Sequence, residues 1–546
     1  MCEKEIKHFR EILIWPIQIY KDESPHSGKE NSICLEGLNS HWIKVDDLLM
    51  RRHSSDASSD AHNHRQTHYA ERVYFQPFVQ RFLYGKESPM KLFYQNVLEK
   101  VRVTLKKREN PVVVVLDVIR TYLYIFEDTD TLILTMEVAS QEPLCIQDAE
   151  DLLDQFRRAY PPYWEWEKGK IKDKAGHCPL MVEFLDGAGT VRAKSDYDKP
   201  ENFLSPLSQK ESGQQPVAAH WAWLLAPFSF VNDKLSPMTV PCRHLVDERI
   251  PVMAHIGLNE SYINRLTTGD IIRLGLAEEA GRSDTLPYAS EFLRDFDEEY
   301  CYDRFWERGS DSKTIKYIAS DYSFVALGNG DNEFFMNSET GMLSHFRHHY
   351  FLMGIIIHFH RAALLGLADS IADAVGKYNS DSGQSDHEIF HKKAHDILDR
   401  LLRFTNRYWF DDISNQSQGK ELFHFWRKKV GTSILYEQVN REVRDLNEYL
   451  EINYEKKQSK RMTFLTWAAT IGMVVSLHLE WGQLMSPPPT GYWENVDQIF
   501  TYCLPTTKYF FPLMLIIFLL YLGVKFTEKI CLSITTFLRN LKTKRR

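Results

Sequence analysis

The sequence MTFLTWAATIGMVVSLHLEWGQL, residues 462–484, is an apolar stretch that continues directly from the charged, amphipathic stretch 420–461. A second apolar run follows at residues 509–526. Because no proline occurs from Lys420 to Met485, the charged and apolar stretches can form one helix. At 1.5 Å per residue this helix would extend on the order of 100 Å, which predicts a stalk that enters a bilayer.

The composition limits the class of protein. A chain of 546 residues is expected to contain more than one domain, and 43% apolar with 26% charged residues is typical of a soluble protein with a local membrane segment. The net charge of -8 gives no case for a nucleic-acid partner. Eight cysteines without a C-x-x-C pair argue against a zinc module or a disulfide scaffold. The N-terminal sequence MCEKEIKHFREILIW contains acidic residues and no uninterrupted apolar core, so a signal peptide is not expected. Most of the chain is therefore expected to be cytosolic.

The sequence pattern of residues 1–340 predicts an α/β or α+β domain. β-branched runs at 112–118, 122–126 and 132–138, with an acidic turn at 127–130, predict neighbouring strands. A helix is expected at 146–159, where Pro161 and Pro162 end it. Further strands are expected at residues 12–20, 180–185, 222–228, 252–256 and 315–327. Pro16 places the first of these at a sheet edge or bulge.

The sequence pattern of residues 341–461 predicts a helical bundle and stalk. The apolar run 344–377 is interrupted by His358, His360 and Arg361, which favours a buried helix over a membrane span. A capping box at 385–388 begins a second helix. The long helix that follows carries an apolar stripe formed by Leu435, Val439, Val443, Leu446 and Leu450.

The apolar stretches predict two transmembrane helices, 462–484 and 509–526, joined by an outer loop, 485–508, and followed by a basic tail, 527–546. Lysines and arginines precede the first span and follow the second, whereas Met485 to Thr507 contains neither. The positive-inside rule then places both termini in the cytoplasm and the loop outside. The prediction is a multi-pass protein of the inner (cell) membrane.

Two spans from one chain cannot enclose a water-filled path, so transport requires an oligomer. Polar residues of the first span lie close to one helical face, with Thr463 at its start. The predicted pore-lining residues are Thr466, Thr470, Met473, Ser476 and Glu480, and those of the outer mouth are Gly482, Gln483, Glu494 and Asp497. Rings of such hydroxyl and carboxylate groups would coordinate and concentrate cations. Alternatively, the hydroxyls bond to carbonyls of their own helix or join neighbouring spans.

Outside the membrane segment, Arg157 and Arg158 beside aromatic residues could bind a phosphorylated ligand such as a small nucleotide. The alternative is a solvated helix end, which basic residues favour. Two further places could bind a metal ion, namely the pair His345 and His349 and the polar tract that contains His53, His62, His64 and His68. The favoured alternatives are ordinary helix packing for the pair, which has no acidic residue nearby in sequence, and a mobile surface insertion for the tract. No nucleophile motif or paired-carboxylate signature is present, so an enzyme is not expected.

The order of a large N-terminal α/β domain, a very long helix continuous with the first span, an acidic outer loop, a second span and a basic tail resembles the CorA family of divalent cation transporters. The resemblance implies a homopentamer whose first span lines the pore. It also implies that the cytosolic funnel senses magnesium, so Mg²⁺ or another divalent cation would be substrate and regulator, with no other cofactor. The family's Gly-Met-Asn filter is absent, because the chain has Gly472-Met473-Val474 in mid-span and Trp481-Gly482-Gln483-Leu484 at the expected depth.

Three functions follow as hypotheses. The first is a CorA-like channel or transporter for metal cations gated by its cytosolic domain. The second is a nucleotide-gated membrane effector of a bacterial antiviral system of the type III CRISPR kind, a role in which divergent CorA-like proteins occur. The third is a membrane-anchored sensor without a pore.

Overall fold

The computed structural model describes residues 4–19, 42–45, 71–85, 88, 90–107, 110–161, 164–167, 170–173, 177–197, 217–230, 240–281, 286–307, 310, 313–377 and 384–484. The chain divides into two units, Met1–Ile452 and Asn453–Arg546. The sheet and most of the helical region after residue 340 therefore belong to the first unit.

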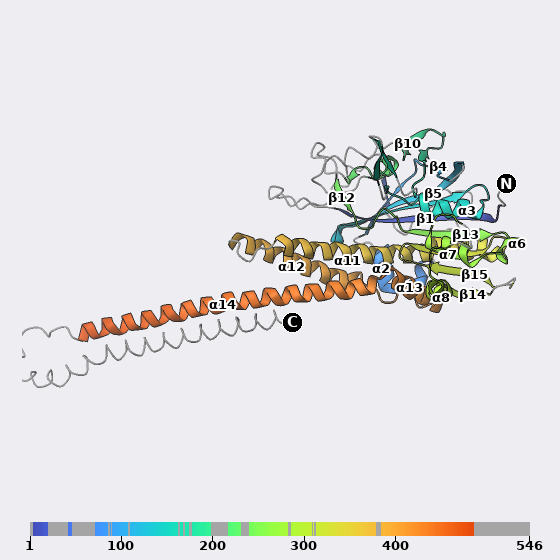
Figure 1. Ribbon diagram of the computed structural model, residues 1–546. Helices are drawn as coiled ribbons and strands as arrows, with labels where there is room; N and C mark the ends of the chain where they lie inside the picture. The colour runs from blue at the N-terminus through green and yellow to red at the C-terminus, as the bar shows by residue number, and fades with distance from the viewer. Residues whose placement is uncertain are drawn as a thin grey trace, which may run out of the picture. The chain divides into compact units, whose positions relative to one another are not determined.

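The first unit is built on a mixed sheet (Figure 1). Its strands are β1 (Ile6–Ile19), β2 (Ile43–Lys44), β3 (Met90–Gln95), β4 (Lys100–Leu105), β5 (Val112–Phe126), β6 (Thr131–Ser140), β9 (Met181–Leu185), β10 (Val191–Asp196), β11 (Phe228–Ser229), β12 (Val240–His244), β13 (Val252–Leu258), β14 (Cys301–Trp306), β15 (Thr314–Ala319) and β16 (Ser323–Asn329). The main order is β10-β9-β4-β5-β6-β1-β13-β16-β15-β14. A separate hairpin pairs β7 (Trp164–Glu167) with β8 (Lys170–Asp173).

Helices surround the sheet and follow it. They are α2 (Pro77–Tyr84), α3 (Ile146–Gln155), α5 (Ala219–Leu225), α6 (Glu260–Ile263), α7 (Thr268–Leu276), α8 (Ser290–Tyr300), α9 (Glu333–Met336), α10 (Met342–His345), the π-helical turn η5 (Phe346–Tyr350), α11 (Phe351–Lys377), α12 (Gln384–Arg407), α13 (Ser417–Val430) and α14 (Thr432–Leu484). The expected α/β or α+β domain followed by a helical C-terminal region is confirmed, and its sheet is mixed.

Strand β1 lies in the middle of the sheet and its register with β6 is continuous through Pro16, so the expectation that Pro16 marks a sheet edge or a bulge is wrong. β1 pairs with β6 along one side. On the other side it pairs with β13 up to Leu13 and with β12 from Ile17 onward. Pro16 lies between these two pairings, where the missing N–H removes no ladder hydrogen bond.

The expected strands 112–118 and 122–126 are one strand, β5. The first half of β5 pairs with β4 and the second half with β3, both antiparallel, and β6 lies along its other side. The acidic turn between β5 and β6 is a 3₁₀ turn, Glu127–Thr129, and Asp130 follows it with φ of 51°. Asparagine and aspartate tolerate this left-handed conformation, which explains the tight reversal.

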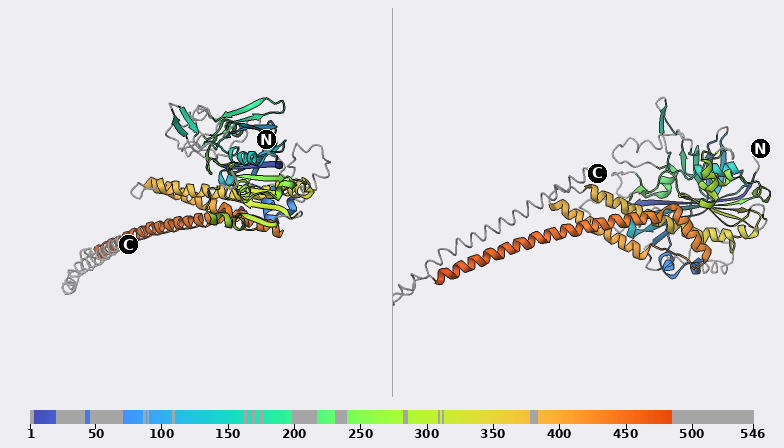
Figure 2. Two further views of the ribbon diagram at one scale, coloured as in Figure 1. Left: turned by 45° about the vertical axis from the view of Figure 1, so that its right-hand side comes forward. Right: turned by 60° about the horizontal axis from the view of Figure 1, so that its bottom comes forward.

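The sheet buries both of its faces. Along β1, Phe9, Leu13 and Trp15 join one core with α3, α5 and α7. Ile12 and Ile14 point to the other face and join a second core with α11, α12 and α13. Figure 2 shows α11 and α12 running side by side. Alternation along one strand thus separates two layers of helices.

Helix α11 is a core helix, as expected. Among the described residues, Met342–Gly376 is the stretch long and apolar enough to cross a membrane, but 83% of its most apolar window is buried inside the protein. His358 and His360 within it are buried. The expected strand 222–228 is instead mostly helix α5, because Trp221, Leu224 and Leu225 pack on the core at helical spacing.

The expected uninterrupted helix from residue 420 is divided at Gly431. This residue adopts φ of 74°, and its N–H donates to the carbonyls of Arg427 and Lys428, which ends α13. A left-handed glycine is a common end of a helix because it has no Cβ to clash. α14 then begins at Thr432 and continues to Leu484, which includes the whole expected first span.

Candidate functional site

The threonines of the predicted pore face lie on α14. The hydroxyls of Thr463, Thr466 and Thr470 each donate to the carbonyl oxygen four residues earlier, at 2.7 to 2.8 Å. The alternative that these hydroxyls bond within their own helix is thus confirmed for all three. Each oxygen keeps its acceptor lone pairs, so cation coordination stays a prediction.

The other predicted pore residues lie further along the chain. Met473 and Ser476 are exposed on α14. Glu480, Gly482 and Gln483 belong to the last turns of α14, where side chains are outside the described part, and Glu494 and Asp497 lie outside the described residues. Their roles stay predictions.

Arg157 and Arg158 follow α3 and are buried in the core of the first unit. Arg158 pairs with Asp154 and, at 2.7 Å, with Glu248. Arg157 donates from Nη2 to the carbonyl of Ala277 at 2.9 Å. The interpretation of the pair as a solvated helix end is therefore wrong. Nucleotide binding by the pair stays a prediction, and at Arg158 a phosphate would have to compete with two carboxylates.

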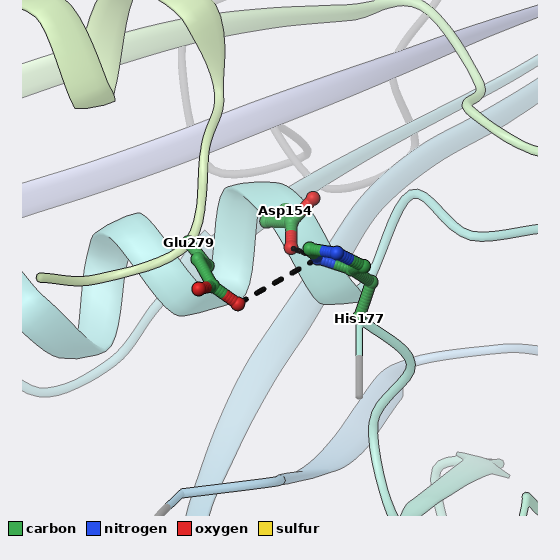
Figure 3. Close-up of side chains that lie close together, drawn as sticks. All are labelled: Asp154, His177 and Glu279. Carbon is green, nitrogen blue, oxygen red and sulfur yellow. Dashed lines mark hydrogen bonds and ion pairs between the residues drawn. The ribbon is translucent and has the colours of Figure 1, made fainter. Parts of the chain in front are cut away.

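A histidine and two carboxylates meet beside this arginine pair (Figure 3). Asp154 comes from the last turn of α3, His177 from the segment before β9, and Glu279 from the segment after α7. His177 Nδ1 lies 3.1 Å from Asp154 Oδ2 and 3.7 Å from Glu279 Oε2. Asp154 is buried, whereas the side chains of His177 and Glu279 are 35% and 51% exposed. The cluster therefore lies where the core meets solvent.

The local structure positions these side chains. Leu152 and Leu153 of α3 are fully buried in the core, which fixes the rotation of the helix. The segment that carries Glu279 is attached to α3, because the Ala280 N–H donates to Asp151 Oδ1 at 2.9 Å. Arg273 Nη1 also donates to the backbone oxygen of Glu279 at 3.0 Å. The backbone around Glu279 is thus held by hydrogen bonds on both sides.

The electrostatics favour a charged pair. Burial alone would raise the pKa of Asp154, but the hydrogen bond from His177 and the charges of Arg158 and Arg157 outweigh it and lower that pKa. The hydrogen bond to Asp154 raises the pKa of His177, against the effect of burial. The cluster can therefore hold a proton on His177 or another cation between the same atoms.

Glu150 lies one turn before Asp154 on α3 and is also buried, but its pKa is raised rather than lowered. Burial raises its pKa to about 9, and the nearby carboxylates of Asp270 and Asp151 add to the rise, while Arg273 opposes it. Between its ordinary pKa of 4.5 and about 9, the folded chain holds a proton that the unfolded chain releases. The free energy of unfolding then falls as pH rises, by up to about 1.4 kcal/mol per pH unit.

The variant Glu150→Gln is expected to raise the free energy of unfolding at pH 8 by about 1–3 kcal/mol and to leave it nearly unchanged at pH 4. Urea unfolding of the full chain at both pH values, followed by tryptophan fluorescence, measures this difference. Glu291→Gln, whose side chain is 83% exposed on α8, is the matched control and should change neither value. Equal effects of Glu150→Gln at pH 4 and pH 8 would show that the carboxyl is ionised in the folded chain.

A second charge cluster is buried on the opposite face of the sheet. The carboxylate of Glu137, on β6, is fully buried and pairs with Arg10, Arg120 and Arg347. Arg347 Nε lies 2.9 Å from Glu137 Oε1, and the Arg120 guanidinium lies 4.3 Å from the centre of the Phe351 ring. Burial alone would raise the pKa of Glu137, but the three guanidinium groups hold it well below its usual range. This cluster joins β1, β5, β6 and η5.

Sequence reasoning missed both clusters. Asp154, His177 and Glu279 are far apart in the chain and form no spacing pattern, and the same is true of Glu137 and its arginines. One feature of the sequence does indicate a buried charge, namely a charged residue within an apolar strand pattern, as at Glu137 in the run 132–138. No protein-family model matches the chain, and comparisons with curated proteins and with solved structures found no match.

Proposed function

We propose that the chain is a homo-oligomeric membrane channel or transporter for metal cations, in which α14 lines the pore and the sheet and helices of the first unit gate it. One observation carries the proposal. The part of α14 in the second unit exposes large apolar side chains, with Phe464 at 72% and Met473 at 67% exposure. Met462, Leu465 and Ile471 are more than half exposed as well.

The free energy of these exposed side chains favours a lipid or protein environment. Burying a large apolar side chain is worth roughly 1.5–3 kcal/mol, so five of them amount to about 10 kcal/mol for one short stretch of helix. By contrast, Val439, Val443 and Leu446, in the part of α14 that belongs to the first unit, are buried in its core. This change from buried to exposed apolar side chains along α14 supports a helix that leaves a folded unit and enters a bilayer.

The rest of the architecture supports the same proposal. A sheet covered by helices on both faces, followed by α11 to α13 and then α14, has the order of parts that the resemblance to CorA transporters implies. In this proposal the oligomer is a pentamer with both termini in the cytoplasm, and residues 509–526 form the second span. Magnesium or another divalent cation is the substrate. Thr470 and Glu480 face the pore.

Flux through proteoliposomes that contain the purified full-length chain tests the proposal. Uptake of Mg²⁺ or Co²⁺, followed by a trapped fluorescent dye, is expected to fall about tenfold or more in Thr470→Leu and in Glu480→Ala, because each removes a ring of oxygen ligands. Ala468→Leu is the matched control, since residue 468 lies about 200° around the helix from Thr470. Its flux should stay close to that of the unmodified chain.

Two outcomes would count against the proposal. Equal flux in all three variants would show that Thr470 and Glu480 do not line the pore. An oligomer without conductance for any tested cation would favour a membrane-anchored sensor. The same assay, repeated with cyclic and linear oligoadenylates in the buffer, tests nucleotide gating. Flux that appears only with nucleotide would favour the antiviral effector, and Arg157→Glu with Arg158→Glu would then be expected to abolish it.

A further inference from the structure

We propose that Asp154, His177 and Glu279 form a binding site for a divalent transition-metal ion, with Zn²⁺ as the ion that fits best. The site lies in the first unit and does not depend on the proposed membrane function. Within the part of the chain that the structure describes, it is the cluster whose histidine and carboxylate donor atoms all lie within 4.8 Å of one another. One imidazole nitrogen and two carboxylate oxygens are ligands that Zn²⁺ accepts.

Two of the three distances between donor atoms are close to those around a tetrahedral ion, and the third is below 4.8 Å. With metal–ligand bonds of about 2.1 Å, the edges of the tetrahedron are roughly 3.4 Å long. His177 Nδ1 lies 3.1 Å from Asp154 Oδ2 and 3.7 Å from Glu279 Oε2, which are values on either side of this edge. The same ring nitrogen faces both carboxylates (Figure 3). An ion placed between the three atoms would therefore need little movement of the side chains.

The neighbours of Asp154 orient its carboxylate for metal binding. Arg158 pairs with Oδ1 of Asp154, whereas Oδ2 faces His177. One oxygen is thus held by a charged hydrogen bond while the other remains directed at the cluster, as is common for carboxylates that bind metals. Because the side chains of His177 and Glu279 are partly exposed, an ion can enter from solvent, and water can occupy the remaining coordination position.

The competing occupant is a proton. With a proton on Nδ1, His177 would form an ordinary ion pair with the two carboxylates, and binding of Zn²⁺ would have to release it. The two cases differ in a direct binding measurement. A metal site binds one ion per chain and loses affinity when either His177 or Glu279 is changed, whereas a simple ion pair gives no saturable binding that depends on these residues.

The experiment uses the full-length chain in detergent, freed of metal with a chelator. Zn²⁺ binding is measured by competition with a chromophoric chelator, and Co²⁺ is added separately to record its visible absorption. We expect one Zn²⁺ per chain and an intense tetrahedral Co²⁺ spectrum. His177→Gln and Glu279→Gln should each weaken Zn²⁺ binding by at least about tenfold and remove the Co²⁺ spectrum.

Two controls separate this site from other histidines. His424→Gln removes a histidine on α13 whose Nε2 lies 2.8 Å from Asp412 Oδ1, and it should not change the affinity. The second control replaces the histidines of the polar tract in one chain, as His53→Gln, His62→Gln, His64→Gln and His68→Gln. The site proposal requires that this chain still binds one Zn²⁺.

Three results would overturn the proposal. They are unchanged Zn²⁺ affinity in His177→Gln and Glu279→Gln, loss of binding only in the chain without tract histidines, and an absence of saturable binding in the unmodified chain. Thermal unfolding without metal checks that each variant folds. Should His177→Gln fail to fold, Glu279→Gln decides the test, because that side chain is half exposed.

Discussion

Replacing Glu137 by Gln is expected to lower the free energy of unfolding by about 3–5 kcal/mol, which for many domains is enough to prevent folding. The fully buried carboxylate is shared by Arg10, Arg120 and Arg347. Without it, three cationic groups would face one another in the core between β6 and η5. The glutamine amide keeps the size of the side chain, so the loss reports charge rather than a cavity.

The dependence on pH identifies the cause. The guanidinium groups hold the pKa of Glu137 well below its ordinary 4.5, so this stabilisation is complete above pH 4.5 and is lost as pH falls toward the lower value in the folded chain. The difference between Glu137→Gln and the unmodified chain, measured by urea unfolding, should therefore be largest near neutral pH and shrink in acid. Glu142→Gln, with a side chain 82% exposed just after β6, is the control and should stay within about 0.5 kcal/mol. A loss in Glu137→Gln that is the same at every pH would contradict the ionic explanation.

Much of the sheet could be predicted from the sequence because its strands are rich in β-branched residues. The regions of β5, β6, β9 and β13 were expected to be strands, but the single expected strand 315–327 is two antiparallel strands, β15 and β16. The errors arose where tertiary context decides the outcome. The sequence predicted a sheet edge or bulge at Pro16. In the structure Pro16 lies within the central strand β1, at the gap between its partner strands β13 and β12. Residues 222–228 read as a strand, although the burial of Trp221 and Leu225 requires a helix.

The candidate site could not be predicted in the same way. Arg157 and Arg158 stand out in the sequence as two adjacent arginines, but their partners in the fold are distant in the chain. Arg158 pairs with Glu248, ninety residues later, and Arg157 donates to the carbonyl of Ala277. His177 and Glu279 carry no local signal at all. Contacts of this kind follow from the order of strands in the sheet, which periodicity along the chain does not determine.

The long helix was predicted from the absence of proline, and its division at Gly431 was missed. A glycine inside a helical pattern is tolerated at moderate cost, so the sequence alone does not distinguish it from a helix end. The structure resolves the question, because α13 must turn there to pack Trp426 into the core before α14 begins. The expected first span nevertheless lies in one helix, and the proposed pore rests on that part.

Substituting Gly354 on α11 is expected to destabilise the fold strongly, although replacing glycine within a helix is usually favourable. A Cβ at this position would lie 2.6 Å from Cη2 of Trp426, 3.1 Å from Cδ1 of Ile14 and 3.2 Å from Sδ of Met253. The missing side chain therefore lets α11 approach α13 and the sheet at once. Gly354→Leu should lower the free energy of unfolding by about 3 kcal/mol, and Gly354→Ala by about 1–3 kcal/mol, because overpacking outweighs helix propensity.

Gly376 provides the matched control in the same helix, because a Cβ there would meet nothing within 4 Å among the described residues. Gly376→Ala should raise the free energy of unfolding by about 0.5–1 kcal/mol, so the two alanine variants are expected to have opposite signs. Urea unfolding of the full chain measures both. Since the indole of Trp426 is the nearest obstacle, Trp426→Phe should cost less in the Gly354→Ala background than alone. A stabilising Gly354→Ala, or additive effects in the double variant, would show that α11 and α13 do not meet at this glycine.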